Sequence, residues 1–445
     1  MQRSSTFKQR WSCQNLESAK AMRSTLIQRQ EAGSPLLMMY AEKDGYRSSG
    51  GSTMNLLPKA GSRSTLKRTL SIPDFEPVKS LRSTLILQPK AGSPLLMLTA
   101  EEYGCRIYNP EDGRVYETKS DFSGYRFLGS SGKWFLVVDS RMKLYIIDVF
   151  SEERIDLPPL ESFKGSLYKI WRRVGEENVM HGLMDDDDPF CDEIPHAAED
   201  LRGRLWVDDK NGNYVVVWQF EMNSFLGFCR TGDDHYREIP TQLGVQRELR
   251  GLYDMVLKGY SLYVFATREF IRHLDLSGQD EDGFKDVSEK HRLPMWMPPL
   301  SMDELESIMK QKKCIPSNKG IAVTRAGQVL LVFTYHLGTS ESHRMFHLYK
   351  RDPKDLDPKT LDTQLLEVHS LGDEALFYDL GITVPADHTL GIEPNSIYFT
   401  RDDRICHNKL SCLDIGVFNL ATKTIKRFHG LSNFNFNDAQ WFLPS

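Results

Sequence analysis

Cysteine and histidine gather at one place in this 445-residue chain, where Cys406, His407 and Cys412 occupy a short stretch. Thiolate and imidazole groups are zinc ligands, but a closed zinc site needs four of them, and no second Cys/His pair stands at finger or ribbon spacing. Neither cysteine has an evident base and orienting partner for nucleophilic catalysis. We interpret the stretch as an ordinary loop.

A run of carboxylates offers a second kind of chemistry. The run consists of Asp185, Asp186, Asp187 and Asp188, and Asp192 and Glu193 follow it. Carboxylates bind calcium, yet the ligand spacing of an EF-hand and its turn glycine are missing. We interpret the run as a solvated loop, with contact to a basic partner surface as the functional alternative.

The remaining catalytic and phosphate-binding signatures are weak. Residues 129–133 read Gly-Ser-Ser-Gly-Lys, but Trp134 follows and no helix begins there, so a β-turn between two strands is predicted. HExxH, GxSxG and GxGxxG do not occur, and His235, His273 and His347 are isolated. The sequence therefore predicts no enzyme, no metal site and no cofactor.

A proline-rich stretch provides a candidate binding anchor. Residues 293–300 read LPMWMPPL and place Trp296 between Met295 and Met297. Aromatic and methionine side chains are frequent anchors at protein interfaces. The alternative is that Trp296 only covers the end of the fold.

Charge is distributed unevenly along the chain. Residues 1–100 carry fifteen Lys or Arg and six Asp or Glu, whereas the remainder carries 41 and 55. The acidic body argues against nucleic-acid binding, and its short apolar runs cannot span a membrane. Seven scattered cysteines and no secretory signal favour the cytoplasm or nucleus. Arg3, Lys8 and Arg10 near an acid-free start leave a mitochondrial presequence as the alternative.

The N-terminal part contains a tandem duplication. Residues 16–46 match residues 75–105 at seventeen of thirty-one positions. The stretch between them, residues 47–70, has too little apolar content to offset the entropy of ordering it. We expect residues 1–92 to be an extension that is largely disordered or partly helical, and residues 93–445 to be one folded domain.

Strand-like runs recur through that domain, with turn signals about every ten residues. Five groups of four runs occupy residues 125–157, 204–239, 253–287, 321–368 and 375–428. Residues 95–118 and 439–443 are expected to share a sixth group. The prediction is an all-β fold, a single β-propeller of about six four-stranded blades, with five or seven as alternative counts. One helix, over residues 302–312, is predicted in an insert.

Several of these segments, in this order, resemble one family. They are Gly-Ser-Ser-Gly-Lys-Trp (129–134), Glu-Arg-Ile-Asp-Leu-Pro-Pro-Leu (153–160), Tyr-Asp-Met-Val-Leu-Lys-Gly (253–259), Leu-Gly-Asp-Glu-Ala-Leu-Phe-Tyr-Asp-Leu-Gly (371–381), Asn-Ser-Ile-Tyr-Phe (395–399), Gly-Val-Phe-Asn-Leu (416–420) and Trp-Phe-Leu-Pro (441–444). The chain resembles the plant F-box-associated propeller proteins, also called domain of unknown function 295 or KIB-type propellers. The resemblance implies a ligase adaptor, in which an F-box docks on a Skp adaptor of a cullin-RING ubiquitin ligase and the propeller receives the substrate.

The N-terminal extension departs from that pattern. Residues 16–24 and 75–83 look like the last helix of an F-box, but the family's Cys-x-x-Trp stretch reads Ala-Met-Arg-Ser or Ser-Leu-Arg-Ser. We therefore expect a non-enzymatic protein-interaction propeller without a working F-box, whose binding to a Skp adaptor is doubtful. The alternatives are a substrate-recognition subunit of such a ligase, and a propeller enzyme or small-ligand binder with convergent His, Asp or Glu on its inner strands.

Overall fold

The computed structural model describes residues that lie within Leu81–Ser445. The described residues are 90–100, 104–118, 120, 122–165, 168–173, 179–183, 194–220, 225–240, 252–266, 271–278, 282–288, 314–337, 343–356, 363–400, 414–428, 431 and 438–445. The predicted helix over residues 302–312 and nearly all of the predicted extension lie outside them. Both stay predictions, as does the domain boundary at residue 93.

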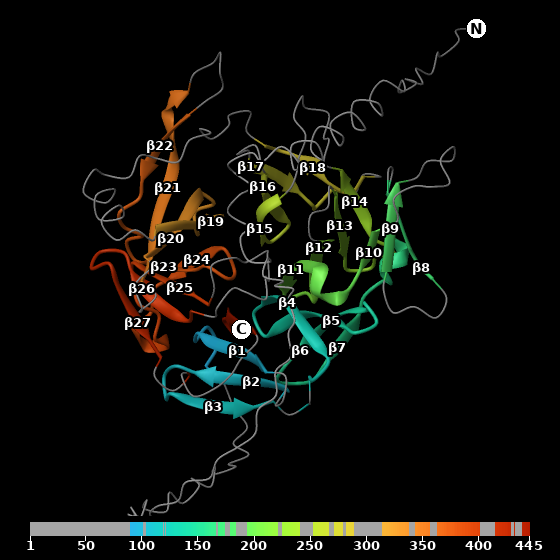
Figure 1. Ribbon diagram of the computed structural model, residues 1–445, viewed down its shortest axis with the longest axis horizontal. Helices are drawn as coiled ribbons and strands as arrows, with labels where there is room; N and C mark the ends of the chain where they lie inside the picture. Colours follow the sequence, from blue (N-terminus) through green and yellow to red (C-terminus); the bar gives the residue numbers. More distant parts are fainter. Residues whose placement is uncertain are drawn as a thin grey trace, which may run out of the picture. The chain divides into compact units, whose positions relative to one another are not determined.

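The strands form the blades of a β-propeller (Figure 1). Blade one contains β28 (Asp438–Phe442), β1 (Leu95–Ala100), β2 (Gly104–Asn109) and β3 (Arg114–Glu117). Blade two contains β4 (Tyr125–Ser131), β5 (Trp134–Asp139), β6 (Leu144–Asp148) and β7 (Arg154–Asp156). Blade three contains β11 (Leu201–Asp208), β12 (Asn213–Phe220), β13 (Phe225–Arg230) and β14 (Arg237–Pro240).

The later blades follow the same order along the chain. Blade four contains β15 (Leu252–Lys258), β16 (Ser261–Ala266), β17 (Ile271–Asp275) and β18 (Lys285–Asp286). Blade five contains β19 (Cys314–Val323), β20 (Val329–Leu337), β21 (His343–Leu356) and β22 (Thr363–Glu367). Blade six contains β23 (Glu374–Phe377), β24 (Ile382–Pro385), β25 (Ser396–Phe399), β26 (Gly416–Asn419) and β27 (Thr424–Arg427). The predicted all-β propeller is confirmed.

Apolar side chains fill the space between consecutive blades. The described residues form six buried clusters, and each cluster joins one blade to the next, including blade six to blade one. A blade is therefore covered on both faces, which explains why a strand such as β12 is apolar nearly throughout. Six junctions between six blades close the ring.

The two ends of the described unit share blade one. The C-terminal strand β28 pairs with β1, where Leu95 lies opposite Phe442. Trp441 is fully buried, and its indole Nε1 donates a hydrogen bond to the carbonyl oxygen of Phe399 in blade six. This pairing of the ends was predicted from the sequence.

Blade six departs from the simple meander. Its strand β23 runs parallel to β25, and β24 lies on the inner side of β23. A single parallel bridge from Val323 to Ile382 joins β24 to blade five, so the two blades form one nine-stranded sheet. The sequence grouping did not anticipate β24.

A three-stranded sheet is inserted between blades two and three. It contains β8 (Tyr168–Arg172), β9 (Val179–Leu183) and β10 (Ile194–His196). Helical structure in the described residues is limited to the 3-10 turns η1 (Leu160–Ser162), η2 (Ala198–Asp200) and η3 (His388–Leu390). No helix in this part of the chain is long and apolar enough to span a membrane.

Candidate functional site

One edge of the propeller collects the turns of several blades. In blades two to five each strand is antiparallel to the next, so the first and third strands end at the same edge. Hydrogen bonds and ring contacts between the turns of neighbouring blades place these edges together. We call this edge the hairpin face and define it by residues 131–134, 206–213, 230–237, 258–261, 276–278, 282–284 and 324–328.

Aromatic residues stand at the hairpin face where blades two, three and four meet. The indole Nε1 of Trp134 donates to the Asp209 carboxylate at 3.0 Å, and Lys133 Nζ lies 5.2 Å from the Trp134 ring centroid. The half-buried rings of Trp206 and Tyr260 contact each other across the next junction, with centroids 4.9 Å apart. Such amphipathic rings carry much of the binding energy at protein interfaces.

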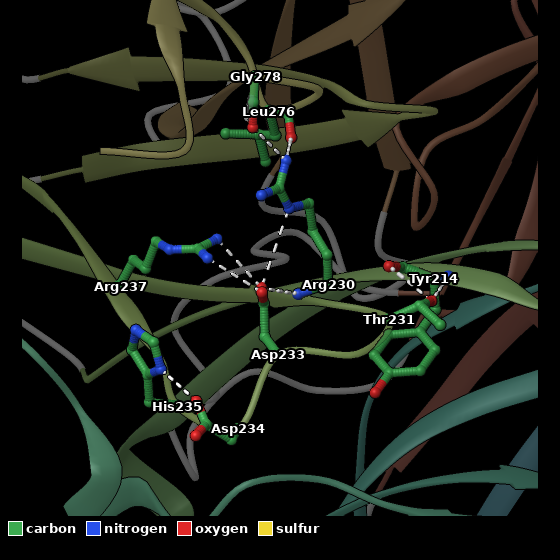
Figure 2. Close-up of polar contacts among 9 residues, drawn as sticks. All are labelled: Tyr214, Arg230, Thr231, Asp233, Asp234, His235, Arg237, Leu276 and Gly278. Carbon is green, nitrogen blue, oxygen red and sulfur yellow. Dashed lines mark hydrogen bonds and ion pairs between the residues drawn. The ribbon is translucent and has the colours of Figure 1, made fainter. Parts of the chain in front are cut away.

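A charged hub organises the β13–β14 turn of blade three (Figure 2). Asp233 accepts two hydrogen bonds from the Arg237 guanidinium, at 3.1 and 3.2 Å, and one from the backbone N–H of Arg230 at 2.8 Å. Figure 2 shows the Arg237 guanidinium directed toward this carboxylate, while Arg230 passes it with Nε 3.9 Å away. The Arg230 guanidinium also donates to the carbonyl oxygens of Leu276 and Gly278 in blade four, so the hub joins two blades.

Further side chains shape this turn and the strand beside it. Asp234 is 92% exposed and bonds to His235 Nδ1 at 2.5 Å, and this hydrogen bond holds the pKa of Asp234 below its usual value. The Thr231 hydroxyl accepts the backbone N–H of Tyr214 at 2.6 Å. Burial, with weaker repulsion from Cys229 and Asp233, raises the pKa of Tyr214 to about 12. The phenol therefore stays neutral while the exposed carboxylate stays charged.

Hydrogen bonds also brace the turns of blades four and five and attach blade five to blade six. Lys258 Nζ donates to the carbonyl oxygens of Thr324 and Arg325 at 2.8 and 3.0 Å. Partial burial lowers the pKa of Lys258, with an opposing contribution from Glu374. The backbone N–H of Arg325 donates to the Thr383 hydroxyl of blade six at 2.8 Å. Side chains on the hairpin face are thus held on ordered turns.

The inner strands of blades three and four hold a buried ion pair. The Arg204 guanidinium lies 3.8 Å from the Asp254 carboxylate and donates to the carbonyl oxygen of Met255 at 2.9 Å. Asp254 also accepts the backbone N–H of Ile321 at 2.8 Å. The two charged side chains therefore contact each other and backbone groups of blades four and five. The described residues contain no group of three His, Cys, Asp or Glu suited to a metal ion.

The structure describes only some of the candidate residues that the sequence singled out. Residues 129–134 form the predicted hairpin, with Gly132 at a φ of +60° in its turn. His273 stacks on Tyr263, and His347 is buried beside Glu367. The following residues lie outside the described ones, so their roles stay predictions: Trp296, Met295, Met297, Asp185, Asp186, Asp187, Asp188, Cys406, His407 and Cys412.

Sequence reasoning missed the residues that the hairpin face brings together. Residues 231–234 (Thr-Gly-Asp-Asp) indicated a turn, but not that Asp233 would hold two arginines. Trp206 lies near the end of the inner strand β11, and its partner Tyr260 lies in the first turn of the next blade. Aromatic residues at the ends of first strands would have been a usable signal.

Comparison with known proteins agrees with the architecture. The family model described as "KIB1-4 beta-propeller" matches residues 107–419. The Arabidopsis thaliana protein named F-box protein At5g25290 is 47% identical over 363 residues, covering 80% of this chain and 86% of that protein. F-box protein At2g14290 of the same plant is 42% identical, covering 84% and 93%, and F-box protein KIB4 is 30% identical, covering 84% and 92%. The resemblance inferred from the sequence is confirmed, and the chain belongs to the KIB1-4 beta-propeller family.

Proposed function

We propose that this chain is a protein-interaction propeller that binds a partner protein at its hairpin face and catalyses no reaction. One observation carries the proposal: aromatic and charged side chains of three consecutive blades stand on turns that hydrogen bonds between blades hold in place. Ordered side chains lose less conformational entropy when a partner binds. Trp206 and Tyr260 are the proposed anchors.

Further contacts are proposed from the sequence. Trp296 with its flanking methionines and the aspartate run at residues 185–188 are candidate contacts, because aromatic and charged side chains favour partner binding. The proposed compartment is the cytoplasm or nucleus. Neither proposal depends on the hairpin face.

The proposal also holds that residues 1–92 do not form a working F-box. Its support is the loss of the family's Cys-x-x-Trp stretch, which reads Ala-Met-Arg-Ser at residues 21–24 and Ser-Leu-Arg-Ser at residues 80–83. A second candidate function is substrate recognition within a cullin-RING ubiquitin ligase. The names of the relatives, F-box proteins, favour this candidate.

Affinity capture from plant cells with full-length baits tests both functions. The baits are the unmodified chain, the double variant Trp206→Ala/Tyr260→Ala, and the control Arg141→Ala. Arg141 is exposed in the β5–β6 turn, at the edge opposite the hairpin face. Thermal unfolding of each bait shows whether the fold is intact before capture.

The proposed function expects proteins that the unmodified chain and Arg141→Ala retain and that the folded double variant loses. Equal recovery by all three baits would contradict binding at the hairpin face. Recovery of a Skp adaptor and a cullin would favour the ligase subunit, and would overturn the proposed loss of the F-box.

A further inference from the structure

The inserted β8–β10 sheet is fastened to blade three by aromatic packing. The Tyr168 ring on β8 stacks on Phe225 of β13, with centroids 4.7 Å apart and planes 27° apart. Phe163 packs against Phe225 as well, at 5.0 Å. One backbone bond, from Lys164 N–H to the carbonyl oxygen of Tyr236, attaches the segment before β8 to the edge of blade three.

Two histidines lie inside this junction. His181 of β9 and His196 of β10 are each only 5% exposed, and His181 Nδ1 lies 2.6 Å from His196 Nε2. The His196 ring stacks on Phe220 of blade three, with centroids 4.0 Å apart and planes 2° apart. The pair thus links β9 to β10 and presses one imidazole against the propeller.

The surroundings assign the protons of the pair. His196 Nδ1 lies 3.7 Å from the Asp200 carboxylate, so this nitrogen carries the hydrogen that faces the acid. His196 Nε2 is then the acceptor, and His181 Nδ1–H is the donor. Asp200 is itself held by the backbone N–H of Ala197 at 2.9 Å. Both imidazoles are neutral in this arrangement.

Few other charged groups face the pair in the described residues. Phe220 and Phe225 of blade three and Tyr168 of β8 contribute uncharged rings. Near η2, the guanidinium of Arg126 donates to the carbonyl oxygens of Ala198 and Leu201, and that of Arg202 donates to those of Glu199 and Leu201. Asp200 is the one carboxylate that the described residues place in an ion pair with either histidine.

We propose that His181 and His196 form an acid-sensitive clasp, which holds the β8–β10 sheet on blade three when both rings are neutral and releases it when both are protonated. One added proton can be shared between the two nitrogens beside Asp200. A second proton places two cations in contact inside an aromatic junction, where water does not screen them. The strands then separate more readily than the blades do.

The direction of the pH dependence follows from the buried rings. Burial, with repulsion from His196, lowers the pKa of His181 from 6.5 to about 4, and burial lowers the pKa of His196. The unfolded sheet therefore binds more protons than the folded one below the ordinary histidine pKa. The stabilisation is complete above about pH 6.5 and is lost progressively as the pH falls toward 4.

Amide hydrogen exchange on the full-length chain tests the clasp. We expect the opening equilibrium of residues 168–172 and 179–183 to rise by about two orders of magnitude between about pH 7 and about pH 4.5, after correction for intrinsic exchange. Amides of β12 and β16 should show no comparable change. The double variant His181→Phe/His196→Phe keeps two rings that cannot be protonated, and its sheet should stay protected at the lower pH.

A second measurement covers the case in which the double variant does not fold. Imidazole nitrogen chemical shifts of the unmodified chain should show two neutral rings at about pH 7, with His196 protonated at Nδ1. A charged ring at that pH would overturn the proposal. So would equal pH-dependent opening in the unmodified chain and the folded double variant. His235→Gln, which changes a histidine on the hairpin face, is the matched control and should leave the opening unchanged.

Discussion

Arg204 of β11 and Asp254 of β15 form a buried ion pair between the innermost strands of blades three and four, with Nη2 and Oδ1 3.8 Å apart. The same carboxylate accepts the backbone N–H of Ile321 in blade five. One side chain, only 2% exposed, therefore connects three consecutive blades. The Asp254 carboxylate therefore holds the inner strands of these blades together.

Replacing this carboxylate should weaken the propeller strongly. Asp254→Ala removes the acceptor for Ile321 N–H and takes a carboxylate away from a buried guanidinium. We expect the free energy of unfolding to fall by about 3 kcal/mol, measured by urea denaturation. Asp282→Ala, an exposed position in the same blade, is the control and should change it by less than about 0.5 kcal/mol. Similar values for both variants would contradict the structural role.

Gly227 should not tolerate a side chain. A Cβ at this position would lie 2.3 Å from the Trp218 ring, which is fully buried. Gly227→Ala should lower the free energy of unfolding by about 2 kcal/mol through overpacking. Gly278→Ala, where the nearest atom lies 3.7 Å from the added Cβ, is the matched control. The prediction is wrong if the two variants have the same denaturation midpoint.

Closure of the ring should depend on the C-terminal strand. Trp441→Ala empties a fully buried site between blades six and one and removes the bond to the Phe399 carbonyl. We expect a loss of about 4 kcal/mol in the free energy of unfolding, with a matching fall in the melting temperature. Leu366→Ala, at an exposed position of β22, should leave the melting temperature nearly unchanged.

Cys229 should be chemically inert in the folded chain. Burial, assisted by repulsion from Asp233, raises the pKa of its thiol far above the ordinary range. The thiolate that reacts with iodoacetamide is then almost unpopulated at about pH 8. Mass spectrometry of the alkylated native chain should show Cys229 unmodified, and denaturation in urea before alkylation should expose it. Rapid labelling in the native state would mean that blade three opens locally.

The blades could be predicted from the sequence because strands that are buried on both faces consist mainly of apolar residues. Strands β5 and β12 belong to blades that their neighbours cover on both faces, and most residues of each strand are apolar. Repetition of such strands in groups of four predicts a propeller, since no single group can bury its own faces. The pairing of β1 with the C-terminal strand β28 in blade one was predicted from the same grouping of strands.

Only the tertiary structure decided which distant residues meet. Nothing in the types or spacing of Arg204 and Asp254, or of His181, His196 and Phe220, indicates that they lie in contact, because each contact depends on how two separate sheets pack. The β8–β10 sheet and the parallel pairing of β23 with β25 were missed for the same reason. Local composition determines whether a segment becomes a buried strand. The packing of the sheets determines which sheet covers that strand. The contacts of the hairpin face and of the two histidines both depend on this packing.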